Sequence, residues 1–278
     1  MNKKFILVIA GVIAIAGVVF VATNKNNGVP CSSRILYCIQ SDSNGKVYPV
    51  NGPSEYSFSI LNDRGSTIKD FAITHTKPMH VIVVRKDLAY FQHVHPEFDR
   101  STGVFTLKNI TFPADGVYRI FADFATPMPV TVYEDVSVGV GAKYTAQVLG
   151  SETRIKIFDG YQISLSPDQP LVSGKEVMLM FDLNRNGAPV TNLQNYLGAL
   201  GHSVILREGT LDFIHAHPME DHGEQTGEMG FMVEFPEAGK YKVFMQFQHE
   251  SKIITSNFVV NVAKGSGMPM PKMDHSMD

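Results

Sequence analysis

The 278-residue chain lacks the features that mark several common functional classes. It has no basic run beyond Lys3-Lys4, and its formal net charge is only −3, so nothing in it favours binding to nucleic acid. After residue 22 no amphipathic stretch of ten or more residues has helical periodicity. No pattern of nucleophile, general base and substrate pocket stands out. We therefore expect a binding protein rather than an enzyme.

Cysteine is scarce, and this limits the redox chemistry of the chain. The two cysteines are Cys31 and Cys38, and they are seven positions apart. In an oxidising compartment such a pair is expected to close a small disulfide loop. A cysteine pair that binds a soft metal is the alternative.

A single long hydrophobic run stands at the start of the chain. Residues 5–22 are apolar throughout and follow Lys3 and Lys4. Such a run can span a bilayer, and the lysines stay on the cytoplasmic side. We predict a transmembrane signal anchor over residues 1–23, with residues 5–22 in the lipid bilayer. The protein would be a single-pass protein of the cell membrane, with its C-terminal body outside the cytoplasm. A cleaved signal peptide is the alternative.

The rest of the chain repeats itself at a nearly constant offset. Gly65 matches Gly187 at 122 positions, and Tyr118 matches Tyr241 at 123, because the second copy has one extra residue near positions 221–230. A nearly constant offset over such a length indicates an internal duplication. The repeated segments are short and alternating, with turn residues between them, which is typical of strands. We predict an all-β fold of two tandem immunoglobulin-like β-sandwich domains after the N-terminal transmembrane helix. The predicted boundaries are a tether at 24–46, domains at 47–145 and 146–264, and a flexible tail at 265–278.

Histidines recur with this duplication. His80, His93 and His95 reappear 122 positions later as His202, His215 and His217. Imidazole is the commonest side-chain ligand for transition metals, so the pattern predicts one metal site in each domain.

The histidines are expected to converge across two hairpins. A two-residue turn at Glu208-Gly209 would place His202 opposite His215, and the same count places His80 opposite His93. Further ligands are sought among polar residues nearby. Asp123 and Gln246 occupy equivalent places in the two copies. The remaining candidates, most of which we expect to be ordinary surface or core residues, are His75, Met79, Glu97, Met128, Met219, His222 and His249.

The tail carries a second kind of ligand. Its last twelve residues hold four of the 13 methionines and one histidine, namely Met268, Met270, Met273, His275 and Met277. Proline and charge exclude a core role for them. Thioether sulfur prefers Cu(I), whereas imidazole also suits Cu(II) and zinc. The combination favours copper as the cofactor, with zinc or another divalent transition metal as the alternative.

Four motifs carry a resemblance. They are PMHVIVVR at 78–85, FQHVHP at 91–96, YRIFADF at 118–124 and VTNLQNYLGA at 190–199. Together they resemble a poorly characterised group of exported bacterial proteins with duplicated His-x-His-Pro β-sandwich units. The resemblance covers about residues 52–262 and implies heavy-metal handling, mainly of copper. The tail resembles the Met-Asp-His-Ser-Met repeats of copper-resistance proteins found outside the cytoplasm.

Three functions are compatible with these patterns. The first is a membrane-anchored protein that buffers copper or passes it to a metal-exchange protein partner. The second is an immunoglobulin-like envelope or adhesion module without metal. The third is a metalloenzyme, because Gly209, His215 and His217 resemble half of a cupin metal motif. The second cupin motif is missing, which argues against it.

Overall fold

The structure is a computed structural model that describes residues 36–74, 76–139, 144–196, 198–216, 218–219 and 226–265. The predicted anchor and the tail residues from 266 onward lie outside these ranges, as do Cys31, His75, His217, His222 and the side chain of His215. Cys38 is disulfide-bonded. Within the described residues no helix is long and apolar enough to cross a bilayer.

The first domain is a sandwich of two sheets. One sheet has the order β1-β3-β7-β6, and the other has the order β2-β9-β8-β4-β5. In chain order the strands are β1 (Tyr37–Ser41), β2 (Val47–Tyr48), β3 (Pro53–Asn62), β4 (His80–Arg85), β5 (Phe91–Val94), β6 (Glu97–Asp99), β7 (Val104–Thr111), β8 (Gly116–Ala125) and β9 (Pro129–Val138). Buried residues of both sheets, among them Tyr56, Phe105 and Ile120, form its core.

The second domain repeats this arrangement. One sheet has the order β10-β11-β12-β13, with β16 also paired to β12, and the other has the order β15-β14-β17-β18. The strands are β10 (Ile155–Phe158), β11 (Tyr161–Pro167), β12 (Glu176–Arg185), β13 (Ala188–Pro189), β14 (Gly201–Arg207), β15 (Phe213–Ala216), β16 (Glu228–Glu234), β17 (Gly239–His249) and β18 (Lys252–Val262). Its core is separate and includes Phe181, Phe231 and Phe247. The chain is thus two tandem immunoglobulin-like β-sandwiches, as the sequence predicts.

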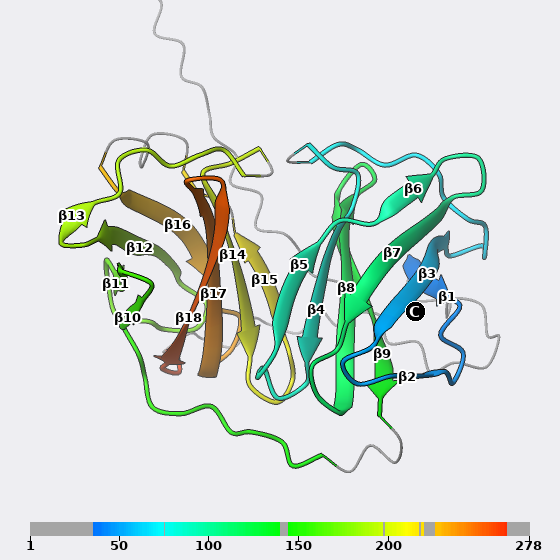
Figure 1. The fold of residues 1–278 in the computed structure, drawn as a ribbon, viewed down its shortest axis with the longest axis horizontal. Helices are drawn as coiled ribbons and strands as arrows, with labels where there is room; N and C mark the ends of the chain where they lie inside the picture. The colour runs from blue at the N-terminus through cyan, green and yellow to red at the C-terminus, as the bar shows by residue number, and fades with distance from the viewer. Residues whose placement is uncertain are drawn as a thin grey trace, which may run out of the picture.

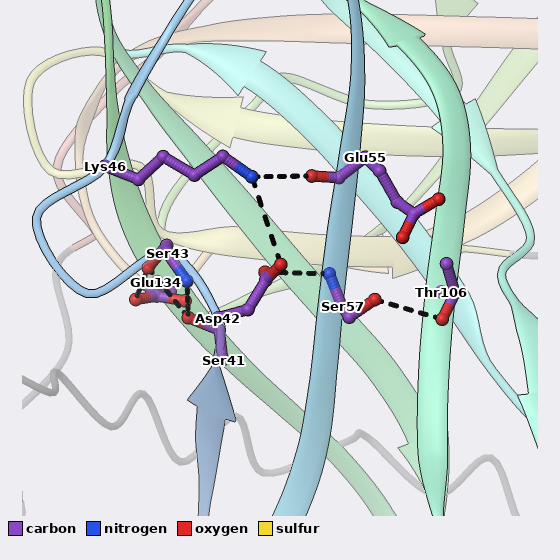
Figure 2. Close-up of polar contacts among 8 residues, drawn as sticks. All are labelled: Ser41, Asp42, Ser43, Lys46, Glu55, Ser57, Thr106 and Glu134. Carbon is purple, nitrogen blue, oxygen red and sulfur yellow. Dashed lines mark hydrogen bonds and ion pairs between the residues drawn. The ribbon is translucent and has the colours of Figure 1, made fainter.

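The predicted tether at 24–46 is wrong over its second half. β1 pairs along β3, and Ile39 is buried in the first core. The polar residues that suggested a linker instead make fixed contacts (Figure 2). Asp42 Oδ1 accepts a hydrogen bond from the Ser57 backbone at 3.0 Å, and Ser43 Oγ donates to buried Glu134 at 2.5 Å. Asn, Ser and Gly composition alone cannot distinguish a linker from a strand whose polar residues are satisfied by the neighbouring strands.

The two domains pack against each other through one sheet from each. In the centre of Figure 1, β4, β5 and β8 of the first domain lie beside β14, β15 and β17 of the second. A third hydrophobic cluster fills this interface, and it contains Ile82 and Val84 from β4 and Val204 and Leu206 from β14. All six residues of β4 are buried, because one face of the strand covers the domain core and the other covers the interface.

Contacts across the interface occur in equivalent pairs. The Phe91 and Phe244 rings stack with centroids 4.1 Å apart, and the repeat-related Phe213 and Phe121 rings lie 4.8 Å apart. Two cations behave in the same way. Lys242 Nζ donates to the Leu88 carbonyl at 2.8 Å, and Arg119, its equivalent in the first domain, donates to the Thr210 carbonyl at 3.4 Å. The interface is therefore close to two-fold symmetric, as in an isologous dimer.

The stacked ring pair gives a stability test of this interface. Phe244 is 3% exposed, so Phe244→Ala should lower the free energy of unfolding by about 3–5 kcal/mol through lost burial and the cavity left behind. Chemical denaturation measures the change. The control is Ile157→Ala, because that side chain is 74% exposed and should cost less than about 0.5 kcal/mol. Equal losses in the two variants would show that the interface contributes nothing to stability.

A buried ion pair connects the β4–β5 turn to the segment around Gln147, which lies between the two domains in the sequence. Arg85 donates two hydrogen bonds to Asp87 at 2.9 and 2.8 Å, and the Gln147 backbone donates a third at 3.0 Å. Burial by itself raises the pKa of the Asp87 carboxyl. The bonds from Arg85, Gln147 and Ala89 outweigh burial and bring that pKa below its ordinary value of 3.8.

Asp87 is therefore expected to stabilise the fold in a pH-dependent way. Its contribution is complete above pH 3.8 and is lost as the pH falls through the lower folded value. Asp87→Asn should cost about 3–5 kcal/mol at neutral pH, because it leaves Arg85 buried without its charge partner. The difference from wild type should shrink at about pH 2. Urea denaturation at both pH values tests this. Asp70→Asn, which breaks an exposed pair with Arg100, should change little at either.

Candidate metal centre

Three imidazoles meet at one end of the domain interface. His80 begins β4, His93 lies on β5, and His95 follows β5 directly. His80 alternates with Ile82 and Val84, so it projects toward the second domain rather than into the core of the first. His80 and His93 are buried, and His95 is half-buried.

The predicted hairpin registers are wrong by two residues. His93 lies opposite Ile82 rather than His80, and His215 lies opposite Val204 rather than His202. Each turn contains four residues instead of two, since Arg85 N donates to Tyr90 O and Arg207 N donates to Asp212 O. A shift of two residues leaves every side chain on its expected face, because side chains alternate with a period of two. The first triad therefore still converges.

The converging atoms are ring nitrogens. His80 Nδ1 lies 3.1 Å from His93 Nε2 and 3.1 Å from His95 Nε2. All three nitrogens lie within 4.8 Å of one another. Ligand nitrogens around a tetrahedral ion with bonds of 2.0–2.1 Å are about 3.3 Å apart. Two of the three separations are thus close to those in a coordination shell, and an ion would draw the third nitrogen pair together.

The other ring nitrogens have partners that fix the tautomers. His80 Nε2 lies 3.0 Å from the Thr74 carbonyl oxygen, which can only accept, so this nitrogen carries the proton. His93 Nδ1 lies 3.1 Å from Gln246 Oε1, while the amide nitrogen of Gln246 donates to Thr255 Oγ1 at 2.9 Å. His93 Nδ1 is therefore also a donor. The lone pairs of His80 Nδ1 and His93 Nε2 consequently face the shared space.

Three ring nitrogens this close together can serve as ligands of one cation. Burial, followed by the nearby His80, Lys77 and His202, lowers the pKa of His95 to about 3. His95 is therefore neutral at physiological pH, which is the form that binds metal.

The second domain contributes to the same place. The His202 ring centroid lies 5.7 Å from that of His93 and 6.3 Å from that of His80. His202 Nε2 lies 2.9 Å from the Tyr196 carbonyl oxygen, which repeats the contact of His80 with Thr74. Thr74 and Tyr196 are 122 positions apart, so the repeat positions both histidines in the same way. The structure joins members of the two predicted sites into one interdomain cluster.

Other candidate residues have different surroundings. Asp123 lies opposite His80 in the β4–β8 register and accepts a hydrogen bond from Thr131 Oγ1 at 2.8 Å. Both ring nitrogens of His249 are engaged by other side chains, Nδ1 with Tyr161 Oη at 2.6 Å and Nε2 with Asn192 Oδ1 at 2.7 Å. Glu97 pairs with Lys108 on the surface, and Met79 packs in the first core. Met128 and Met219 are exposed.

Sequence reasoning missed the residues that orient the rings. The Thr74 and Tyr196 carbonyls carry no side-chain signal, although both lie six positions before a repeat histidine. The sequence predicts Gln246 as a possible ligand in the second domain. In the structure it holds His93 of the first, so its role depends on the domain interface.

Comparisons with known proteins give the family and a wide range of structural neighbours. A search of curated proteins finds no match. Solved structures at 10–12% identity include the Escherichia coli adhesin FdeC, with a TM-score of 0.25 over 82% of this chain and 63% of that one. A tandem repeat of a large adhesion protein has a TM-score of 0.28, with 81% and 48% covered. A titin immunoglobulin tandem has a TM-score of 0.21, with 82% and 97% covered.

These scores are too low for the neighbours to assign a function. The chain spans less than two thirds of the two adhesion structures. The family model, in contrast, matches each sandwich separately, over residues 39–139 and 155–264. By these two matches, the chain belongs to the family described as a domain of unknown function, DUF8832.

Proposed function

We propose that the protein binds a transition-metal ion at the interdomain imidazole cluster formed by His80, His93, His95 and His202. The observation that carries this proposal is the convergence of ring nitrogens from His80, His93 and His95, which lie within 4.8 Å of one another. The Thr74 carbonyl and the Gln246 amide oxygen orient two of these rings through their other nitrogens. Metal-bound histidines commonly donate their second ring nitrogen to such a carbonyl or amide partner. His215 and His217, at the repeat-equivalent positions, are proposed to add ligands from the second domain.

Copper is the proposed ion, with zinc or another divalent transition metal as the alternative. Neutral imidazole suits Cu(II) and zinc alike. The methionines and His275 of the tail favour copper, because thioether sulfur prefers Cu(I). Asp123, opposite His80, is a further ligand candidate. We propose that the protein buffers this metal or exchanges it with a protein partner, without catalytic turnover.

The proposed location is outside the cytoplasm, on a membrane anchor formed by residues 5–22. Two observations support it. The apolar run follows two lysines, and Cys38 is disulfide-bonded, which suits an oxidising compartment.

The alternative is an immunoglobulin-like envelope or adhesion module that carries no metal. Two of the structures described above are adhesion proteins, but their TM-scores of 0.25 and 0.28 are too low to decide between the two functions. Elemental analysis of the purified protein separates them, since the alternative requires no stoichiometric metal.

Metal titration of the full chain in detergent tests the proposal directly. Cu(II) or zinc should bind, and an excess of 100 times Kd should raise the free energy of unfolding by about 2.7 kcal/mol. His93→Ala should remove this binding, because it deletes a nitrogen of the triad. His249→Gln is the matched control, since His249 is buried among Tyr161 and Asn192 and should leave metal uptake intact. Wild-type protein that takes up neither metal by calorimetry would refute the proposal.

A second variant tests whether the centre is shared between the domains. Gln246 belongs to β17 of the second domain but orients His93 of the first. Gln246→Ala should weaken metal binding by about 10–100-fold, as is usual when the outer partner of a metal-bound histidine is removed. Gln248→Ala, two residues along the same strand, keeps its backbone hydrogen bond and should not alter affinity. Unchanged affinity in Gln246→Ala would show that the metal site does not depend on the hydrogen bond between His93 and Gln246.

A further inference from the structure

A second group of soft ligands lies on the outer sheet of the second domain, away from the imidazoles. β12 and β16 pair antiparallel, with Met178 opposite Met232 and Met180 opposite Gly230. Along β12 the neighbours Val177, Leu179 and Phe181 are buried in the core. Since strand residues alternate between faces, Met178, Met180 and Met232 project outward.

A fourth methionine completes the group from the other side of β16. Pro218 forms an antiparallel bridge with Phe231, and Met219 N donates to Gly230 O at 3.0 Å. This register places Met219 beside Gly230. Pro218 shares its face with the buried Phe231, so Met219 projects outward, and it is 45% exposed.

Gly230 is the point around which the thioethers gather. A Cβ at this position would lie 3.0 Å from the sulfur of Met178 and 3.0 Å from the sulfur of Met180. The two sulfurs therefore occupy the space that a side chain would fill, and they lie at most about 6 Å apart. Bonds of soft metals to sulfur are about 2.3 Å long, and the methionine side chain rotates about three bonds. Small rotamer changes would bring both sulfurs onto one ion.

The charges around the methionines favour a cation. Acidic cross-strand pairs of β12 and β16 flank the methionines at both ends. The pair at one end is Glu176 and Glu234, and the pair at the other end is Asp182 and Glu228. The outward positions of these two strands between those pairs carry no lysine or arginine. A monovalent cation would thus approach a surface with acidic residues at both ends.

We propose that Met178, Met180, Met219 and Met232, here called the thioether patch, bind a soft monovalent ion of the Cu(I) class. Thioether sulfur selects Cu(I) over hard and borderline cations. The patch contains no imidazole and shares no residue with the interdomain cluster, so this proposal stands independently of the first. Packing of methionine over glycine accounts for the positions of Met178 and Met180, but it does not require the exposed Met219 and Met232 beside them.

Silver(I), which is not oxidised under ordinary conditions, serves as the probe for this class of ion. The full chain carries ¹³C at the methionine methyl groups and is titrated with silver nitrate in chloride-free buffer. The four methyl signals of the patch should shift together and saturate at one ion. Each methyl signal is first assigned with single Met→Leu variants, so that binding by the tail alone is recognised because it leaves the patch signals unmoved. Unmoved patch signals would overturn the proposal.

The double variant Met178→Leu/Met180→Leu tests the ligand role. Leucine and methionine are similar in volume, so the fold should persist while the affinity at the patch falls at least about tenfold. Met128→Leu, which replaces an exposed methionine of the first domain, should bind silver at the patch as wild type does. His93→Ala should also leave the patch signals responsive. Affinity in the double variant equal to that of Met128→Leu would refute the assignment. If the double variant does not fold, the wild-type shifts decide alone.

Discussion

The packing of one sheet from each domain against its repeat-related copy is the constraint on which the rest of the structure depends. Equivalent residues meet across this interface with near two-fold symmetry. A two-fold arrangement brings any position near its axis close to its own copy. His80 and His202 are such copies, with ring centroids 6.3 Å apart. The described side chains of the histidine pattern, His80, His93, His95 and His202, therefore lie in one cluster at the domain interface.

The symmetry is incomplete, and the differences fall on the residues around the cluster. Asp123 in the first domain corresponds to Gln246 in the second. Gln246 accepts from His93 as a neutral amide, which orients the ring without the added basicity that a carboxylate confers. A homodimer of one domain could not have an amide on one side and a carboxylate on the other. Duplication within one chain allows the two halves to diverge while a short linker keeps them together.

The duplication, the strands and the convergence of the first triad could be predicted from the sequence, because each depends on local period and spacing. The hairpin registers could not. Leu88 and Leu211 adopt positive φ angles of 62° and 61° within four-residue turns, and leucine gives no signal for that conformation. The sequence indicates a linker at β1 because the strand is short and lies among polar residues. The first error concerns turn geometry, and the second concerns hydrogen bonds between polar residues and neighbouring strands. Amino-acid composition predicts neither.

The interface was also missed, although a signal for it exists. Residues 81–84 are apolar without alternation, and a strand of this kind is expected where both faces are covered. In a two-sheet sandwich an outer face turned to solvent would be polar. The continuous apolar run therefore required a second covering layer, and the repeat supplied a second copy of the same surface. The unbroken apolar run at residues 81–84, taken together with the duplication, therefore predicts that the two domains are in contact.

The two proposed ligand sets differ in chemistry and in access, and the fold of the second domain separates them. Its β14–β17 sheet carries His202 into a buried interface, whereas its β12–β16 sheet presents thioethers to solvent. Metal in the interface can leave only if side chains or domains move, so exchange there is expected to be slow. An ion on an open sheet face has no such barrier. Nitrogen ligands in a closed site and sulfur ligands in an open one would therefore favour retention at the first and rapid exchange at the second. Pro218 and Met219 directly follow the repeat histidines in the sequence, and they pair with β16. This segment therefore connects the two proposed ligand sets along the chain.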